Sequence, residues 1–215
     1  MPSSLVAVLA FYTAVLLSGA AAEPSSTHSC RTWAQATGKR DCTAIELSRV
    51  PPAPGLWDAL TESIGRNHYS LRSLTLTSLS IDDGMATDML GALLSRPGPP
   101  SLVRLDLRGN QLGLEAADAV KRLLQSTPLE YLNVAGNDAL GDAGIQIIVD
   151  AINGSPTMRV LNIGKSGLSP TGVCSITATA GINKLAQLYL FENNVGDVGA
   201  KCISDLISNS PSLRM

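Results

Sequence analysis

Apolar residues recur along this chain in one order that repeats every 27–31 positions. The order is Leu-x-x-Leu-x-Leu, then a polar turn residue, then a stretch in which apolar residues have helical spacing. A period of this length with a repeated internal order predicts an array of similar structural units. The first residues of the successive copies are Cys42, Leu71, Leu102, Leu129, Met158, Leu185 and Leu213.

Each copy predicts one strand followed by one helix. Leu105 and Leu107 are two positions apart and face one side of a short strand, whereas Asp106 and Arg108 face the other side. The next polar residue, Asn110 in this copy, is suited to bonding backbone groups where the chain leaves the strand. Helical periods are expected to open at Ala116, Gly144, Gly172 and Gly199. Their predicted buried faces include Val120, Leu123, Leu124, Ile148, Ala151, Ile152, Ile203, Leu206 and Ile207.

Such units must stack, because neither the strand nor the helix buries its apolar face alone. Strands lie ~4.8 Å apart and helices ~8–10 Å apart, so the stack curves, with a concave parallel sheet and convex helices. The order resembles the leucine-rich repeat family, and the repeat length with a full helix resembles its ribonuclease-inhibitor-type subfamily. The resemblance is close over residues 71–215 and looser over 42–70. We therefore predict an α/β leucine-rich repeat solenoid, a horseshoe, over residues 42–215, with about six repeats of which the last is incomplete. An ordinary α/β domain is the alternative, and the regular spacing disfavours it.

Residues 1–22 differ in composition from the rest of the chain. An uncharged apolar run from Leu5 to Leu17 is followed by small residues that end in Ala20-Ala21-Ala22. This pattern predicts a secretory signal peptide whose removal leaves Glu23 as the first residue. A retained membrane anchor is the alternative, because the segment is almost long enough to span a bilayer and its first four residues contain no Lys or Arg.

The lead-in at residues 23–41 precedes the first, degenerate repeat, where an exposed core end needs a cover. Extracellular leucine-rich repeat proteins often close this end with a disulfide. The resemblance therefore implies a bridge between Cys30 and Cys42, with Trp33 over the apolar end. Such a bridge contributes roughly 2–3 kcal/mol by the loop-entropy estimate. Two free thiols in a cytosolic protein are the alternative.

Other covalent features remain open in the sequence. Cys174 and Cys202 lie near equivalent points of neighbouring predicted helices, and both a bridge and two separate thiols fit this spacing. Asn153 opens an N-glycosylation sequon at a predicted helix end. The chain stops just after Leu213 opens another strand, without the polar cap of a terminal repeat, so we expect a longer natural protein or a truncated gene product.

Charge and motifs exclude several classes of function. The net charge is −2, and the 16 Lys and Arg residues form no run, so the footprint of a nucleic-acid-binding protein is missing. The sequence contains two histidines and no zinc, calcium or nucleophile motif. Gly164-Lys165-Ser166 is similar to the end of a phosphate-binding loop, but Arg159 stands at the position of the required upstream glycine, and the repeat accounts for all three residues. We therefore expect no catalysis and no cofactor.

Strand residues that point away from the core are expected to form the binding surface. These predicted partner-binding residues are Arg104, Asp106, Arg108, Tyr131, Asn133, Asn162, Lys165, Gln187, Tyr189, Phe191 and Glu192. Tyr and Arg are favoured interface residues, and the mixture of charges favours a protein ligand over nucleic acid. The plainer interpretation is that strands are often aromatic and that charges solvate the surface.

The sequence thus favours a secreted or cell-surface scaffold that binds a protein of unknown identity through its concave face. A second hypothesis is an intracellular regulator of an enzyme or GTPase, because the repeats resemble those of ribonuclease inhibitors and Ran GTPase-activating proteins. A third is the N-terminal ectodomain fragment of a larger receptor. Membrane association is expected only if residues 1–22 are an uncleaved anchor or the chain is a fragment.

Overall fold

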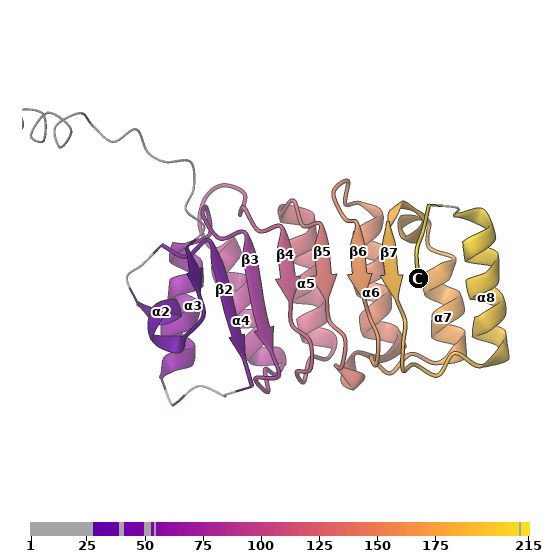
Figure 1. Ribbon diagram of the computed structural model, residues 1–215, viewed down its shortest axis with the longest axis horizontal. Helices are drawn as coiled ribbons and strands as arrows, with labels where there is room; N and C mark the ends of the chain where they lie inside the picture. Colours follow the sequence, from indigo (N-terminus) through magenta and orange to yellow (C-terminus); the bar gives the residue numbers. More distant parts are fainter. Residues whose placement is uncertain (1–27, 39–40, 50–52, 54, 211) are drawn as a thin grey trace, which may run out of the picture.

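A computed structural model describes residues 28–38, 41–49, 53, 55–210 and 212–215. The predicted signal peptide, residues 1–22, lies outside the described residues. Strands and helices alternate along the described chain (Figure 1). The strands are β1 (Ser29–Cys30), β2 (Ala44–Ser48), β3 (Ser73–Thr77), β4 (Arg104–Asp106), β5 (Tyr131–Asn133), β6 (Val160–Asn162) and β7 (Gln187–Tyr189). The α-helices are α2 (Trp33–Thr37), α3 (Leu56–Arg66), α4 (Asp83–Leu94), α5 (Leu114–Ser126), α6 (Gly141–Asn153), α7 (Pro170–Thr177) and α8 (Gly196–Asn209). Two short 3₁₀ helices are η1 (Asp138–Leu140) and η2 (Ala180–Lys184).

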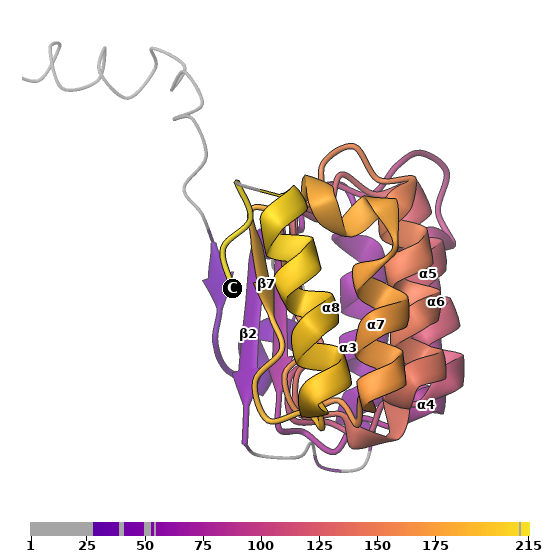
Figure 2. The same ribbon diagram turned by 90° about the vertical axis from the view of Figure 1, so that its right-hand side faces the viewer.

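The strands form one parallel sheet in the order of the chain, from β1 to β7. Equivalent leucines are paired in register: Leu105 lies opposite Leu132, Leu132 opposite Leu161, and Leu161 opposite Leu188. The helices all lie on one side of the sheet, and the other side carries none of them (Figure 2). This arrangement confirms the predicted α/β solenoid. We call the sheet face without helices the open face; it corresponds to the predicted concave face.

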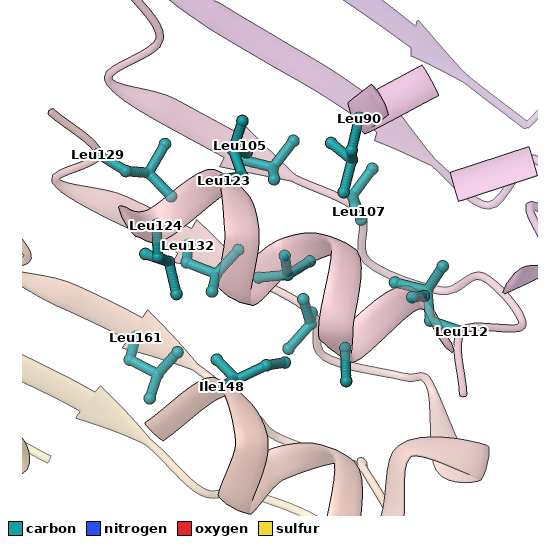
Figure 3. Close-up of a cluster of buried hydrophobic side chains, with 14 of the residues drawn as sticks. Leu90, Leu105, Leu107, Leu112, Leu123, Leu124, Leu129, Leu132, Ile148 and Leu161 are labelled. Carbon is teal, nitrogen blue, oxygen red and sulfur yellow. The ribbon is translucent and has the colours of Figure 1, made fainter. Parts of the chain in front are cut away.

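One hydrophobic core runs between the sheet and the helices (Figure 3). Leu105 and Leu107 of the strand region and Leu123 of α5 are fully buried in this core. Leu132 and Ile148 continue the same core in the next repeat. The apolar residues with strand spacing and those with helical spacing therefore pack against each other in a single layer, as the sequence predicts.

Asparagine side chains join successive repeats. The buried Asn110 amide accepts hydrogen bonds from the backbone N–H groups of Leu79 and Ile81 and donates to the carbonyls of Leu76 and Leu107. Asn193 makes the same kind of bonds to the repeat before it. Backbone groups that leave the strand are thereby paired without water. The predicted role of these turn residues is confirmed.

Ser166 stands at the position of Asn110, Asn137 and Asn193, and the preceding loop explains the difference. That loop, after Asn137, is one residue longer than the loop after Asn110 and forms η1. Within it, the N–H of Leu140 donates to the carbonyl of Asn137, at 3.1 Å. Because the Leu140 N–H is already bonded within the turn, no side-chain amide at position 166 is required to accept from it.

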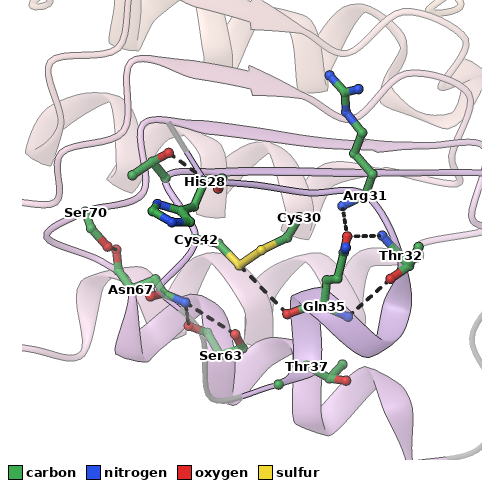
Figure 4. The surroundings of a disulfide bond; sticks show 12 residues. His28, Cys30, Arg31, Thr32, Gln35, Thr37, Cys42, Ser63, Asn67 and Ser70 are labelled. Atoms are coloured by element: carbon green, nitrogen blue, oxygen red, sulfur yellow. Dashed lines mark hydrogen bonds between the residues drawn. A yellow bond between two sulfur atoms is a disulfide. The ribbon is translucent and has the colours of Figure 1, made fainter. Parts of the chain in front are cut away.

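The lead-in has more structure than the sequence indicated. Its strand β1 pairs with β2, and its helix α2 begins with a reciprocal cap between Thr32 and Gln35. The disulfide between Cys30 and Cys42 joins this unit to the first repeat, with the two Cα atoms 6.0 Å apart (Figure 4). Trp33 packs against the core. The predicted Cys30–Cys42 bridge is confirmed, and the lead-in extends the stack by one strand and one helix.

Three details differ from the expected helices. The helices begin two or three residues before Ala116, Gly144, Gly172 and Gly199. Ile207 of α8 is 49% exposed, although a buried position was predicted, because α8 is the last helix of the described stack and packs against α7 only on one side. Cys174 and Cys202, left open by the sequence, form a disulfide that joins α7 to α8.

Candidate interaction surface on the open face

Two aromatic side chains are exposed at the β7 end of the open face. Tyr189, the last residue of β7, is 39% exposed, and Phe191, two residues after it, is 49% exposed. The Tyr189 hydroxyl donates to the side-chain oxygen of Gln187, at 3.2 Å. An apolar patch of this kind in a chain with a large buried core is suited to contact with another molecule.

Phe191 is held in place by the residue beside it in the previous repeat. A Cβ atom added at Gly164 would lie 2.5 Å from the Phe191 ring. The ring therefore lies directly over the Gly164 backbone, in a space that only glycine leaves free. The equivalent residue one repeat earlier is Ala135, so the strand itself tolerates a side chain there. The glycine makes room for the aromatic ring.

A second group lies at the centre of the open face. The guanidinium carbon of Arg104 lies 3.4 Å from the ring centroid of Tyr131 in the neighbouring strand. The guanidinium therefore lies over the face of a partly buried ring, as in cation–π contacts. Arg104 and Arg108 are both exposed.

Asp106 and Asn133 are not accessible, which corrects their assignment to the predicted surface. Asp106 is 6% exposed and Asn133 is 2% exposed. The Asp106 carboxylate accepts from the Arg108 backbone N–H and from the Asn133 amide, each at 3.1 Å. The Asn133 oxygen in turn accepts from the N–H of Ala135. Both side chains point away from the core as predicted, but each accepts a hydrogen bond from the backbone N–H two residues ahead.

Asn162 repeats this bond, with its oxygen accepting from the N–H of Gly164 at 3.1 Å. It is partly exposed, as is Gln187. The structure thus brings together most of the predicted residues on one face, while only part of that set remains available to a ligand.

The residues at the exit of each strand share a left-handed backbone conformation. Lys165 has φ of 47° and Glu192 has φ of 54°, and both side chains are exposed. The complete column is Arg49, Ser78, Gly109, Gly136, Lys165 and Glu192. A left-handed conformation costs a non-glycine residue about 1–2 kcal/mol. Glycine occupies this position in two of the six copies, and this is the sequence feature that could have predicted the left-handed conformation.

Other chemistry is sparse in the described residues. No group of three or more His, Cys, Asp or Glu residues there could hold a metal ion. His68 is buried, and neither of its ring nitrogens has a hydrogen-bond partner in the described part of the chain. Lys165 and Ser166 form a strand exit, with Ser166 fully buried, so they build no phosphate-binding loop. Asn153 is exposed at the end of α6, and its glycosylation stays a prediction.

Comparison with known families decides the nature of the repeats. A family model described as "Leucine Rich repeat" matches residues 98–121, 125–148 and 182–204. The repeats are leucine-rich repeats. Stacked leucine-rich repeats form extended surfaces that are suited to protein binding. Membership of the ribonuclease-inhibitor-type subfamily stays an interpretation of repeat length.

Two curated proteins resemble the leucine-rich repeats of this chain. Protein NLRC5 of Mus musculus is 28% identical over 124 residues, which are 56% of this chain and 6% of that protein. FERM domain-containing protein C of Dictyostelium discoideum is 29% identical over 117 residues, which are 53% of this chain and 8% of that protein. The chain therefore matches only a small fraction of each relative's length.

Proposed function

We propose that this protein is a secreted or surface-exposed scaffold that binds a protein ligand through its open face. The observation that carries the proposal is the pair of exposed aromatic side chains, Tyr189 and Phe191, on the sheet face that no helix covers. Buried aromatic side chains provide much of the binding energy in protein interfaces. The space left by Gly164 supports a role for Phe191 beyond packing within its own repeat.

Export is supported by the cysteines and by the apolar segment. Both cysteine pairs are disulfide-bonded, Cys30 with Cys42 and Cys174 with Cys202. Disulfides persist in oxidising compartments and are rare in the cytosol. Among the described residues, no helix is long and apolar enough to cross a membrane. The apolar segment at residues 1–22 is the part of the chain on which the choice between a signal peptide and an anchor depends.

The ligand surface is tested by a double variant, Tyr189→Ala with Phe191→Ala. Cells that express the full chain are treated with a membrane-impermeant crosslinker, and crosslinked proteins are quantified by mass spectrometry. We expect the specific partner to be lost from the double variant, because each aromatic anchor contributes at least about 1–2 kcal/mol to binding.

The matched control is Val198→Ala with Ile207→Ala. These side chains are 59% and 49% exposed and lie on α8 in the same terminal repeat, but on the helix side of the sheet. Unfolding temperatures of both variants establish that they fold. A partner that crosslinks equally to the aromatic double variant would place the binding site elsewhere.

Export is tested by N-terminal sequencing of the protein from the culture medium. A secreted product that begins at Glu23 is expected. Full-length protein retained in the cytosol, with reduced cysteines, would favour the intracellular regulator instead. Full-length protein in the membrane fraction would favour the anchored form.

A further inference from the structure

The open face is more basic than its sequence indicates. Arg104, Arg108 and Lys165 are exposed. The nearest predicted counter-charge, Asp106, is buried and bonded to a backbone N–H and to Asn133. The mixed charge pattern expected from the sequence therefore does not reach the surface at the centre of this face.

The two arginines also form no ion pair within the described part of the chain. The ion pair found there joins Arg31, just after β1, to Glu46 of β2 at 3.1 Å, and β2 lies two strands from β4. No carboxylate of a described residue lies within 4.0 Å of the Arg104 or Arg108 guanidinium. Because Arg104 is stacked on Tyr131, its planar group is pre-oriented and its N–H edges are available for a carboxylate.

The positions of the charged and aromatic groups define a ligand length. The arginines belong to β4 and the strand exit after it, and the aromatics belong to β7 and its exit, three strand steps away. Three steps of ~4.8 Å make about 14 Å, which an extended peptide spans with about four residues at ~3.3 Å each. Glu192 lies beside Phe191, so a ligand carboxylate is unfavourable at the aromatic end.

We infer that the open face binds an extended acidic segment of a partner protein. Its carboxylates contact Arg104 and Arg108, and an aromatic or aliphatic side chain about four residues away packs on Tyr189 and Phe191. This inference rests on the proposed function and adds the chemistry of the ligand to it.

A nucleic acid fits the same surface less well. Phosphates follow one another along a strand and need cations along the whole path. Between the arginines and the aromatics, the outward positions of β5, β6 and their exits hold uncharged residues, among them Asn133, Ala135, Val160 and Gly164. Lys165 lies at the edge of this path, and Glu192 repels phosphate at its end.

The test is a selection from a displayed library of random twelve-residue peptides on the immobilised full chain. We expect enrichment of peptides with Asp or Glu about four residues from an aromatic or aliphatic residue. A selected peptide is then labelled with fluorescein, and its Kd is measured by anisotropy. The double variant Arg104→Glu with Arg108→Glu should weaken binding about tenfold or more at low salt, and wild-type affinity should fall as salt increases.

The matched control reverses two charges on the helix side of the same repeat, Lys121→Glu with Arg122→Glu. This variant should bind the peptide within about twofold of the wild type. A second selection, on the Arg104→Glu, Arg108→Glu variant, should enrich Lys and Arg in place of Asp and Glu. That reversal would not follow from a general loss of folding.

The outcomes separate this inference from the proposed function. Neutral peptides that lose binding to the Tyr189→Ala, Phe191→Ala variant would overturn the acidic ligand and leave the open-face site intact. Acidic peptides that bind all variants equally would overturn both. Failure to enrich any peptide would overturn the acidic ligand. The acidic ligand would also be overturned by a labelled twelve-nucleotide uridine strand that bound more tightly than every selected peptide, if its binding depended on Arg104 and Arg108.

Discussion

Replacing Asn137 by alanine should destabilise the protein far more than the same change at Ser166, although the two residues occupy equivalent positions. Asn137 is fully buried. Its oxygen accepts from the Leu112 N–H at 3.1 Å, and its nitrogen donates to the Val134 carbonyl at 2.7 Å and to Leu107 at 3.2 Å. The side chain thereby connects two repeats.

The magnitude follows from the partners that alanine leaves behind. Leu107 keeps a second bond from Asn110, at 2.7 Å, but the buried N–H of Leu112 loses its partner and Val134 retains only a long contact of 3.5 Å. An unpaired buried polar group costs about 1–3 kcal/mol, so Asn137→Ala should lower the free energy of unfolding by about 3 kcal/mol.

Ser166→Ala provides the comparison. The Ser166 hydroxyl makes contacts of 3.3 Å with the Gly164 carbonyl and 3.5 Å with the Val134 carbonyl. Each acceptor already has a shorter bond, from Gly136 N–H at 2.9 Å and from Asn137 at 2.7 Å. No group is left unpaired, so the loss should stay below about 1 kcal/mol.

The assay is urea unfolding followed by far-ultraviolet circular dichroism, with the disulfides intact. The shift in midpoint multiplied by the m value gives the change in free energy of unfolding. Equal losses for the two variants, within about 0.5 kcal/mol, would refute the argument that paired donors set the stability of the ladder.

Three further predictions concern the core, the second disulfide and the ligand surface. Leu105→Ala should cost about 2–5 kcal/mol in the same unfolding assay, because the side chain is fully buried; a loss below about 1 kcal/mol would contradict this. Replacing Cys174 and Cys202 by serine opens a link across 28 positions and should cost about 3–4 kcal/mol, measured against the wild type under non-reducing conditions. Tyr189→Asn should leave stability unchanged or raise it by up to about 1 kcal/mol, because the amide can accept from the Phe191 N–H, while affinity for a selected peptide falls.

The fold could be predicted because its main determinants are local. The two-residue spacing of Leu105 and Leu107 predicts the buried face of a strand, and Asn110 indicates where the chain leaves that strand. The first residues of the helices were harder to predict from the sequence, because a residue of another repeat caps the helix start. Asp83 of α4 accepts from the N–H groups of Gly113 and Ala116 at the start of α5. A cap supplied from about 30 residues away leaves no signature in the sequence around the helix that it starts.

For the candidate site, the sequence predicted which side of the sheet each side chain faces, but not whether that side chain reaches solvent. Strand alternation correctly places Asp106 and Tyr189 on the same side of the sheet. Alternation does not distinguish a side chain that reaches solvent from one that folds back onto its own backbone. Asp and Asn are short enough to bond the N–H two residues ahead, whereas Tyr is not. Residue chemistry at the outward position therefore decides which columns form a surface, and this rule can be applied to a sequence.

Applied along the sheet, this rule explains why the aromatic part of the proposed ligand surface lies at β7. Asp106, Asn133 and Asn162 occupy one outward column, and each accepts the backbone N–H two residues ahead. In the last strand the same column holds Tyr189, and the N–H of Phe191 has no such bond among the described residues. The repeat gives up one local hydrogen bond and exposes two aromatic rings. Because a backbone bond is worth about 1 kcal/mol and a buried aromatic anchor more, this exchange favours binding over stability. In the proposed complex, the ligand's apolar side chain therefore contacts β7.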